Sequence, residues 1–166
     1  MIYAALAGIA FLLSVLLPLQ AQAACSDPPA PEVVWRRCLQ DNLNLTGVDL
    51  SNAQLRDSTF IRSTLDGSDM SGVDAYRARF ISASMVGVTL DGARLQQADL
   101  TKADLTGASL VEANLRQAIL IDADLTGADL TGANLGGARL RNAILSGATW
   151  IDGDRICAEG SVGRCQ

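Results

Sequence analysis

The sequence contains no histidine and few aromatic residues. Among its 166 residues there is no His, and Phe, Trp and Tyr together make up 4%. The lack of His removes the side chain that most often acts as an acid, a base or a metal ligand near neutral pH. The scarcity of aromatic residues argues against an ordinary globular core, although 49% of the residues are hydrophobic. Ala and Leu must therefore supply most of the apolar volume.

The charge balance excludes further classes of function. Lys and Arg number 13 against 18 Asp and Glu, a formal net charge of -5. An acidic chain is repelled by phosphate backbones, which disfavours nonspecific binding to nucleic acid. Ser and Thr are common, but no base is present to activate a hydroxyl as a nucleophile. The sequence predicts no catalytic residue, no cofactor and no enzymatic activity.

The segment from Ala98 to Leu145 repeats every five residues. It reads ADLTK ADLTG ASLVE ANLRQ AILID ADLTG ADLTG ANLGG ARLRN AIL, with Leu two residues after every Ala. A period of five matches neither an α-helix nor a flat strand. A fixed period is typical of a repeat architecture. The same frame continues with lower fidelity over residues 43–150.

The repeat also predicts a coil length. Each unit has two inward residues separated by one outward residue, and a bend follows. Four such units would close a coil of 20 residues. Glycine recurs without interruption at that spacing, in Gly47, Gly67, Gly87, Gly107, Gly127 and Gly147. Because glycine readily adopts the positive φ of tight bends, this column predicts that residues 20 apart stack on one face.

The tandem A(D/N)LXX units, clearest in ADLTG ADLTG ANLGG over residues 123–137, resemble the pentapeptide-repeat family. The resemblance implies an all-β fold, a right-handed quadrilateral parallel β-helix with about 20 residues per coil. Residues 43–150 would form ~5.5 coils, a rod ~25 Å long at the usual strand spacing. Ala75 stands where a large residue is expected. The least regular coil is therefore predicted near Val73–Arg79, with Tyr76 turned inward or the backbone distorted.

The first 23 residues resemble a secretory signal peptide. An apolar run ends in Ala21-Gln22-Ala23, which predicts cleavage after Ala23. No Lys or Arg precedes the run, so an uncleaved membrane anchor remains open, as does lipid modification of Cys25. Export predicts a periplasmic or extracellular location, or the thylakoid lumen in a photosynthetic cell. Disulfides persist in such compartments.

The four cysteines flank the repeat. Residues 24–42 are predicted to form a Pro-rich segment and N-terminal cap, and residues 151–166 a C-terminal cap. Cys25 and Cys38 lie before the rod, and Cys157 and Cys165 lie after it. A disulfide needs Cα atoms within about 7 Å, whereas the rod separates its ends by ~25 Å. The expected pairs are therefore Cys25–Cys38 and Cys157–Cys165, in structural rather than redox or metal-binding roles.

The 20-residue frame sorts the charges of the rod by face. The two faces of the Leu45 and Leu50 columns carry nine acidic residues and no basic ones. The two faces of the Leu55 and Phe60 columns carry nine basic and four acidic residues. On the latter faces we predict a basic and apolar interaction stripe of Ile61, Arg62, Arg79, Ile81, Lys102, Ile119, Ile121, Arg139 and Arg141.

Both the isoleucines and the aspartates of these faces have a simpler interpretation than a binding site. The isoleucines also suit strands that merely pack against one another. Aspartates one coil apart, such as Asp49 with Asp69 or Asp104 with Asp124, offer the oxygen ligands that Ca²⁺ prefers. They are equally the ordinary polar positions of the repeat. No metal site is predicted.

Two functions fit these features. The first is an exported, non-enzymatic scaffold or protein-interaction module with segregated acidic and basic faces. Its partner would be an unknown protein or envelope component, with membrane contact only through an uncleaved leader. The second comes from the resemblance, since some pentapeptide-repeat proteins mimic B-DNA and bind DNA gyrase. The acidic faces would suit that role, whereas the leader, the basic faces and the cysteines oppose it.

Overall fold

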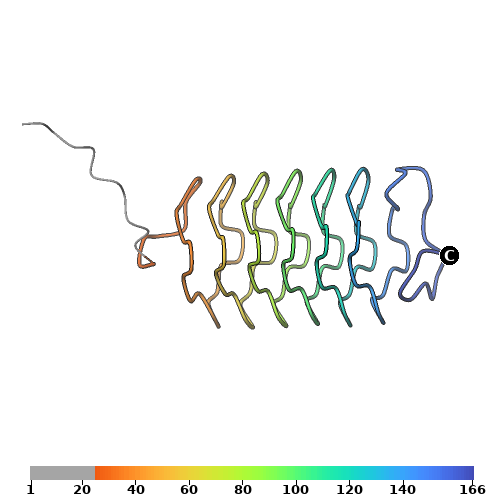
Figure 1. Ribbon diagram of the computed structural model, residues 1–166, viewed down its shortest axis with the longest axis horizontal. Helices are drawn as coiled ribbons and strands as arrows, with labels where there is room; N and C mark the ends of the chain where they lie inside the picture. Colours follow the sequence, from red (N-terminus) through yellow and green to blue (C-terminus); the bar gives the residue numbers. More distant parts are fainter. Residues whose placement is uncertain (1–24) are drawn as a thin grey trace, which may run out of the picture.

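The structure, a computed structural model, describes residues 25–166. The predicted signal peptide and its cleavage site lie outside these residues. The described chain winds into a rod of stacked coils, with residue 25 and the C-terminus at opposite ends (Figure 1). Successive coils of the rod meet through single-residue parallel bridges, and within residues 25–166 no helix or longer strand forms. This part of the chain accordingly holds no helix capable of spanning a membrane.

Each parallel bridge joins residues 20 apart, the spacing of the glycine column. The series begins with Val34 and Gln54 and ends with Asp129 and Thr149. The backbone N–H of Leu105 donates to the carbonyl oxygen of Asp124 at 2.7 Å. Hydrogen bonds of this kind recur along the rod, so each coil is paired to the next through its backbone.

The rod begins earlier than the predicted boundary at residue 43. Bridges start at Val34, and units centred every five residues from Val34 to Thr149 make 24 units, or six coils rather than ~5.5. Trp35, Cys38 and Gln40 are 2%, 0% and 5% exposed, because they occupy inward positions of the first coil. None of the three residues is Ala or Leu, so the five-residue period was not recognised in this part of the sequence.

Every bend of the rod contains a residue in the left-handed region. From Arg37 to Gly147 the second bend residue of each unit has φ between 55° and 73°, and 13 of these residues are not glycine. At Gly67 a Cβ would meet no atom within 4 Å. The preference of glycine for positive φ is therefore sufficient to explain that position.

Leu and Ala columns fill the core, with aromatic residues in its N-terminal half. The rings of Phe60 and Phe80 stack with centroids 5.2 Å apart, and Trp35 lies 6.3 Å from Phe60. Serines that replace Ala are buried, but their hydroxyls bond to the backbone. The Ser63 hydroxyl donates to the carbonyl oxygen of Gln40 at 2.6 Å.

The prediction of an irregular coil near Val73–Arg79 is wrong. Asp74 bridges to Gln54 and Arg94 as in any other coil. Val73 and Ala75 are both fully buried, so the larger Val73 supplies apolar volume where Ala75 lacks it. Tyr76 does not turn inward. Its hydroxyl lies 3.2 Å from Oε1 of Gln97 at the surface.

The C-terminal residues fold back over the last coil. Ile156 bridges to Thr149 and Val162 bridges to Ile144, both antiparallel. The cysteines form the expected pairs, Cys25–Cys38 and Cys157–Cys165, with Cα atoms 5.3 and 4.9 Å apart. Each disulfide therefore closes a short loop at one end of the rod.

Candidate interaction surface

The four units of a coil define four faces of the rod. We number them by their central residues in the first coil: Val34 for face 1, Leu39 for face 2, Asn44 for face 3 and Asp49 for face 4. Each face includes the two bend residues that follow each of its central residues. Faces 1 and 2 are called the basic half, and faces 3 and 4 the acidic half.

The acidic half carries only negative charge within the rod. Its acidic residues are Asp49, Asp66, Asp69, Asp91, Asp104, Glu112, Asp124, Asp129 and Asp152. Most of these carboxylates accept hydrogen bonds from the chain.

Five of the aspartates hold their own bend. Oδ1 of Asp49 accepts from the backbone N–H of Ser51 at 2.9 Å, and Asp129 accepts from Thr131 at 2.9 Å. Asp69, Asp104 and Asp124 make the same contact. Hydrogen bonds from the side chain and backbone of Ser51 lower the pKa of Asp49. The Asp or Asn of the repeat motif therefore has a structural role, since it caps the N–H two residues on.

Two further aspartates hold the bend of the next coil. Oδ1 of Asp66 accepts from the Ser84 hydroxyl at 2.6 Å and from the Val86 N–H at 3.0 Å. Asp91 bonds to the Val111 N–H in the same way, at 3.1 Å. These bends have Ser at the central position, so a carboxylate from the preceding coil replaces the missing cap.

Asp152 and Glu112 complete the acidic half. Asp152 accepts from the backbone N–H groups of Asp154 and Arg155. The bond from Arg155 is the main cause of its lowered pKa. Among residues 25–166, Glu112 is the one acidic residue of this half whose side chain makes no hydrogen bond or ion pair.

The basic half holds eleven of the 13 basic residues of the sequence, against five acidic residues. The basic residues are Arg36, Arg37, Arg56, Arg62, Arg77, Arg79, Arg94, Lys102, Arg116, Arg139 and Arg141. The acidic residues are Asp41, Asp57, Asp74, Asp99 and Asp122. Sequence reasoning missed Arg36 and Arg37, because the first two units were assigned to the cap. The signal was present, since Val33 and Cys38 fit the five-residue period.

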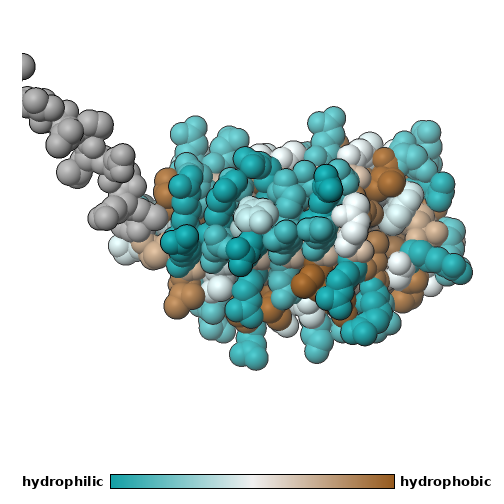
Figure 2. All heavy atoms as spheres, viewed as in Figure 1, coloured by the Kyte–Doolittle hydropathy of each residue, from teal (hydrophilic) through white to brown (hydrophobic). Residues whose placement is uncertain are grey.

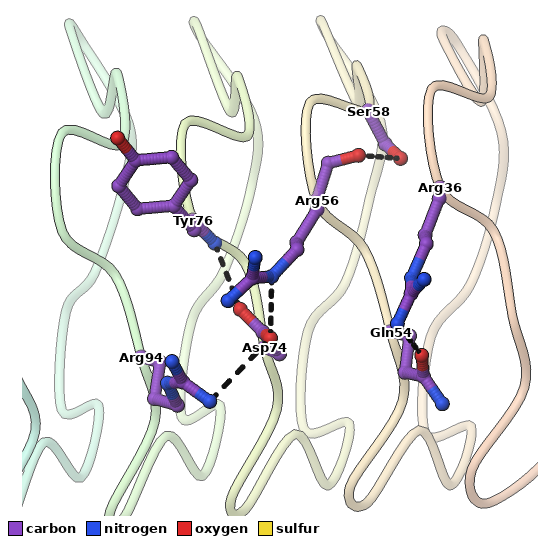
Figure 3. A network of polar contacts seen from close by, with 7 residues as sticks. All are labelled: Arg36, Gln54, Arg56, Ser58, Asp74, Tyr76 and Arg94. Carbon is purple, nitrogen blue, oxygen red and sulfur yellow. Dashed lines mark hydrogen bonds and ion pairs between the residues drawn. The ribbon is translucent and has the colours of Figure 1, made fainter.

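On face 1, several charged side chains contact residues of a neighbouring coil. Nε of Arg56 lies 2.6 Å from Oδ2 of Asp74, and Nη1 of Arg94 lies 3.6 Å from the same oxygen (Figure 3). The guanidinium of Arg56 also lies over the ring of Tyr76, 5.6 Å from its centroid. Arg36 reaches Gln54 of the next coil. These contacts join neighbouring coils and neutralise some of the positive charge.

An open hollow lies near the first bends of face 1. Its volume is about 440 Å³, and it is lined by Arg36, Arg37, Arg56 and Asp57. Asp57 also lies 3.5 Å from Nε of Arg77. The carboxylate of Asp57 neutralises part of the positive charge of the hollow. We therefore treat the hollow as part of the basic half and not as a separate site.

Face 2 contains the whole predicted stripe, and its cations are free. They are exposed, and within residues 25–166 none forms an ion pair or a side-chain hydrogen bond. These five residues are Arg62, Arg79, Lys102, Arg139 and Arg141. In the view of Figure 2, hydrophilic side chains project along the rod.

The apolar part of the stripe is largely covered. Ile121 is only 8% exposed, and Ile61, Ile81 and Ile119 are half-buried. The prediction that isoleucines form an exposed part of the stripe is wrong for Ile121. The side chain of this first bend residue packs against the rod. Large exposed hydrophobic residues lie elsewhere, at Leu39, Leu43, Val86, Ile144, Ile151, Ile156 and Val162.

The stacked aspartates show no metal-binding cluster. Asp49 and Asp69 face each other across a bridge, but each is bonded to its own bend. Residues 25–166 contain no group of three His, Cys, Asp or Glu placed to hold a metal ion.

Comparison with known proteins identifies the repeat. A family model described as pentapeptide repeats matches residues 41–74, 76–111 and 108–147, in eight copies. The chain is 30% identical to HetL, a pentapeptide repeat protein involved in heterocyst differentiation regulation from the cyanobacterium Nostoc sp. strain PCC 7120. That match covers 74% of this chain and 68% of HetL, with a TM-score of 0.52.

Two other solved structures match the chain at lower similarity. The chain is 25% identical to Rfr23 from the cyanobacterium Cyanothece 51142, over 71% of this chain and 90% of that one, with a TM-score of 0.32. It is 18% identical to QnrB1, a plasmid-mediated fluoroquinolone resistance protein, over 74% and 80%, with a TM-score of 0.33. A search of curated proteins found no match. The family match spans more than half of the residues, and this chain belongs to the pentapeptide-repeat family.

Proposed function

We propose that this protein is an exported, non-enzymatic scaffold that binds an acidic partner through its basic half. The partner is a protein of the envelope or extracellular space. The rod is taken to have the right-handed, four-sided coil of its family. One observation carries the proposal: the five cations of face 2 are exposed and uncompensated, whereas the carboxylates of the acidic half mostly bond to the chain.

The free cations form a fixed array along the rod. Arg79 and Arg139 occupy one column three coils apart, and Arg62 and Lys102 occupy another two coils apart. At a strand spacing of about 4.8 Å these pairs are separated by about 14 and 10 Å along the axis. A rigid backbone lowers the entropic cost of presenting such an array. The spacing fits an extended acidic surface rather than a small molecule.

Two features support export. The leader resembles a signal peptide, and the four cysteines in residues 25–166 all form disulfides, which persist in oxidising compartments.

The test is recovery of partners from an envelope extract by matched variants. The triple variant Arg79→Gln, Arg139→Gln and Arg141→Gln removes three positive charges from the basic half. The control Asp49→Asn, Asp69→Asn and Asp129→Asn removes three negative charges but keeps an oxygen that can cap each bend. We expect the arginine variant to lose the recovered partner and the control to keep it. Equal recovery by both variants would reject the basic half as the binding surface.

A second function rests on the nine carboxylates along the acidic half. A DNA-mimic protein would use such charges to bind DNA gyrase or another nucleic-acid-binding protein. Inhibition of supercoiling by purified residues 25–166, lost in the Asp→Asn triple variant, would favour this function over the first. A normal supercoiling rate in the presence of excess protein would dismiss it.

A further inference from the structure

The C-terminal cap covers only half of the rod's end. Residues 155–157 pair with residues 148–150 on face 4, and residues 161–163 pair with residues 143–145 on face 3. The Trp150 N–H donates to the Arg155 carbonyl oxygen at 2.7 Å, and the Gly163 N–H donates to that of Ala143 at 2.8 Å. Faces 1 and 2 of the last coil receive no such strand.

The uncovered part of the last coil presents unpaired backbone groups. The N–H groups of Leu135, Gly137, Leu140 and Asn142 have no acceptor within residues 25–166. The carbonyl oxygens of Ala133 and Ala138 have no donor there either. The corresponding groups one coil earlier are all bonded, as in Leu115 N–H to Asn134 at 2.9 Å. Such an unpaired edge is a template for another strand.

The side chains at this end are also incompletely buried. Leu115, Ala118 and Leu120 are fully buried, whereas their counterparts one coil later are only partly buried, namely Leu135, Ala138 and Leu140. The end therefore combines apolar surface with an open backbone edge.

The cap has an open outer edge of its own. The N–H and C=O groups of Ile156 and Val162 have no backbone partner within residues 25–166. The two residues are 59% and 49% exposed. The end of the rod is therefore a step, about 4.8 Å higher on the acidic half than on the basic half, the height of one strand.

We propose that this step is the docking surface for a second copy of the chain, joined tail to tail. A two-fold axis perpendicular to the rod can place the cap of each copy over the open half of the other. The cap runs antiparallel to its own coil, and the two-fold axis reverses it. It would therefore run parallel to the partner's last coil, the sense in which all coils of the rod already stack. The interface is self-complementary, as two-fold symmetry requires.

The charges of the two halves of the step are complementary. The open segment, residues 133–142, contains Arg139 and Arg141 and no acidic residue. The cap, residues 151–166, contains Asp152, Asp154 and Glu159 against Arg155 and Arg164. Opposite charges across an interface favour encounter and register. In this dimer the free cations of the two copies lie on opposite sides, so one dimer could hold two acidic partners.

Sedimentation equilibrium of residues 25–166 tests the proposal, because this segment contains every described coil and both disulfides. We expect a dimer mass that dissociates on dilution. The variant Ile156→Pro with Val162→Pro removes two N–H groups that no residue of the described chain uses, and we expect association to weaken by about tenfold or more. The matched control, Ile156→Thr with Val162→Thr, keeps both N–H groups and should remain dimeric.

A second variant avoids any effect of proline on folding. Asp154→Lys with Glu159→Lys reverses two exposed charges of the cap and leaves the basic half unchanged. We expect severalfold weaker association, with a smaller difference at high salt. A monomer at every concentration, or dimers unaffected by both the proline and the lysine variants, would overturn the proposal. Because Arg139 and Arg141 lie in the open segment, loss of the partner by the arginine variant supports the basic half only where that variant still forms the dimer.

Discussion

The two halves of the rod carry opposite charges and use them differently. On the acidic half, carboxylates such as Asp66 and Asp129 hold backbone N–H groups of the bends, and a disulfide-bonded cap closes the end. On face 2 of the basic half, cations such as Arg79 and Arg139 have no partner within the described chain, and the end is open. The charged residues that the fold needs are therefore different from those that are free to bind a partner.

Loss of the C-terminal disulfide should have the largest effect on stability. Cys157→Ser with Cys165→Ser opens a loop with a sequence separation of 8. The loop-entropy relation predicts a loss of about 2–3 kcal/mol in the free energy of unfolding, measured by denaturant titration without reductant. Amide exchange should accelerate at Leu145 and Gly147, which bond to the cap, more than at Leu115 and Gln117. Uniform acceleration would contradict a cap that protects the acidic half alone.

The next largest loss of stability should come from the removal of a bend cap. Asp66→Ala deletes the acceptor for the Ser84 hydroxyl and the Val86 N–H. Loss of such a cap costs about 1–2 kcal/mol. Asp66→Asn keeps an acceptor oxygen and should lose much less. If Asp66→Asn proved as unstable as Asp66→Ala, negative charge rather than bend capping would be the important property.

The ion pairs of face 1 should contribute less. Asp74→Ala removes the contacts with Arg56 and Arg94, whose side chains are 40% and 55% exposed. We expect a loss of about 0.5–1 kcal/mol. The loss should shrink as salt rises, because salt screens exposed charges. A loss independent of salt would point to the packing of Arg56 on Tyr76 instead.

Acidification should weaken the acidic half. The pKa of Asp49 is lowered in the folded protein by hydrogen bonds from Ser51, so its contribution is present above the unfolded pKa of about 3.9. That contribution is lost as the pH falls through the folded value. The melting temperature should therefore fall on acidification below about pH 4, and less steeply for Asp49→Asn. Identical pH profiles for the two proteins would exclude a role for this carboxylate.

The features of the structure that depend on the repeat period could be predicted from the sequence. The features that depend on residues departing from the repeat, or on the cap, could not. The glycine column implied residues stacked 20 apart, and rod length implied the disulfide pairs, because both depend only on spacing. The first coil was missed because Trp35 and Cys38 depart from the Ala/Leu pattern. The regular coil at Ala75 depends on Val73 beside it, which a column-by-column comparison does not reveal. The open end depends on where the cap folds back, which no period encodes.

The most direct test of the account compares binding of a soluble acidic polymer by the wild-type rod and by a variant of its basic half. Poly-L-glutamate serves as the probe, with affinity measured for wild-type residues 25–166 at several salt concentrations. We expect binding that weakens with salt, and about tenfold or more weaker binding by the Arg79→Gln, Arg139→Gln, Arg141→Gln variant. Its unfolding free energy should change by less than about 0.5 kcal/mol per site, as for exposed side chains without partners. Unchanged binding by this variant, or a large loss of stability, would contradict the claim that these cations are free for a partner.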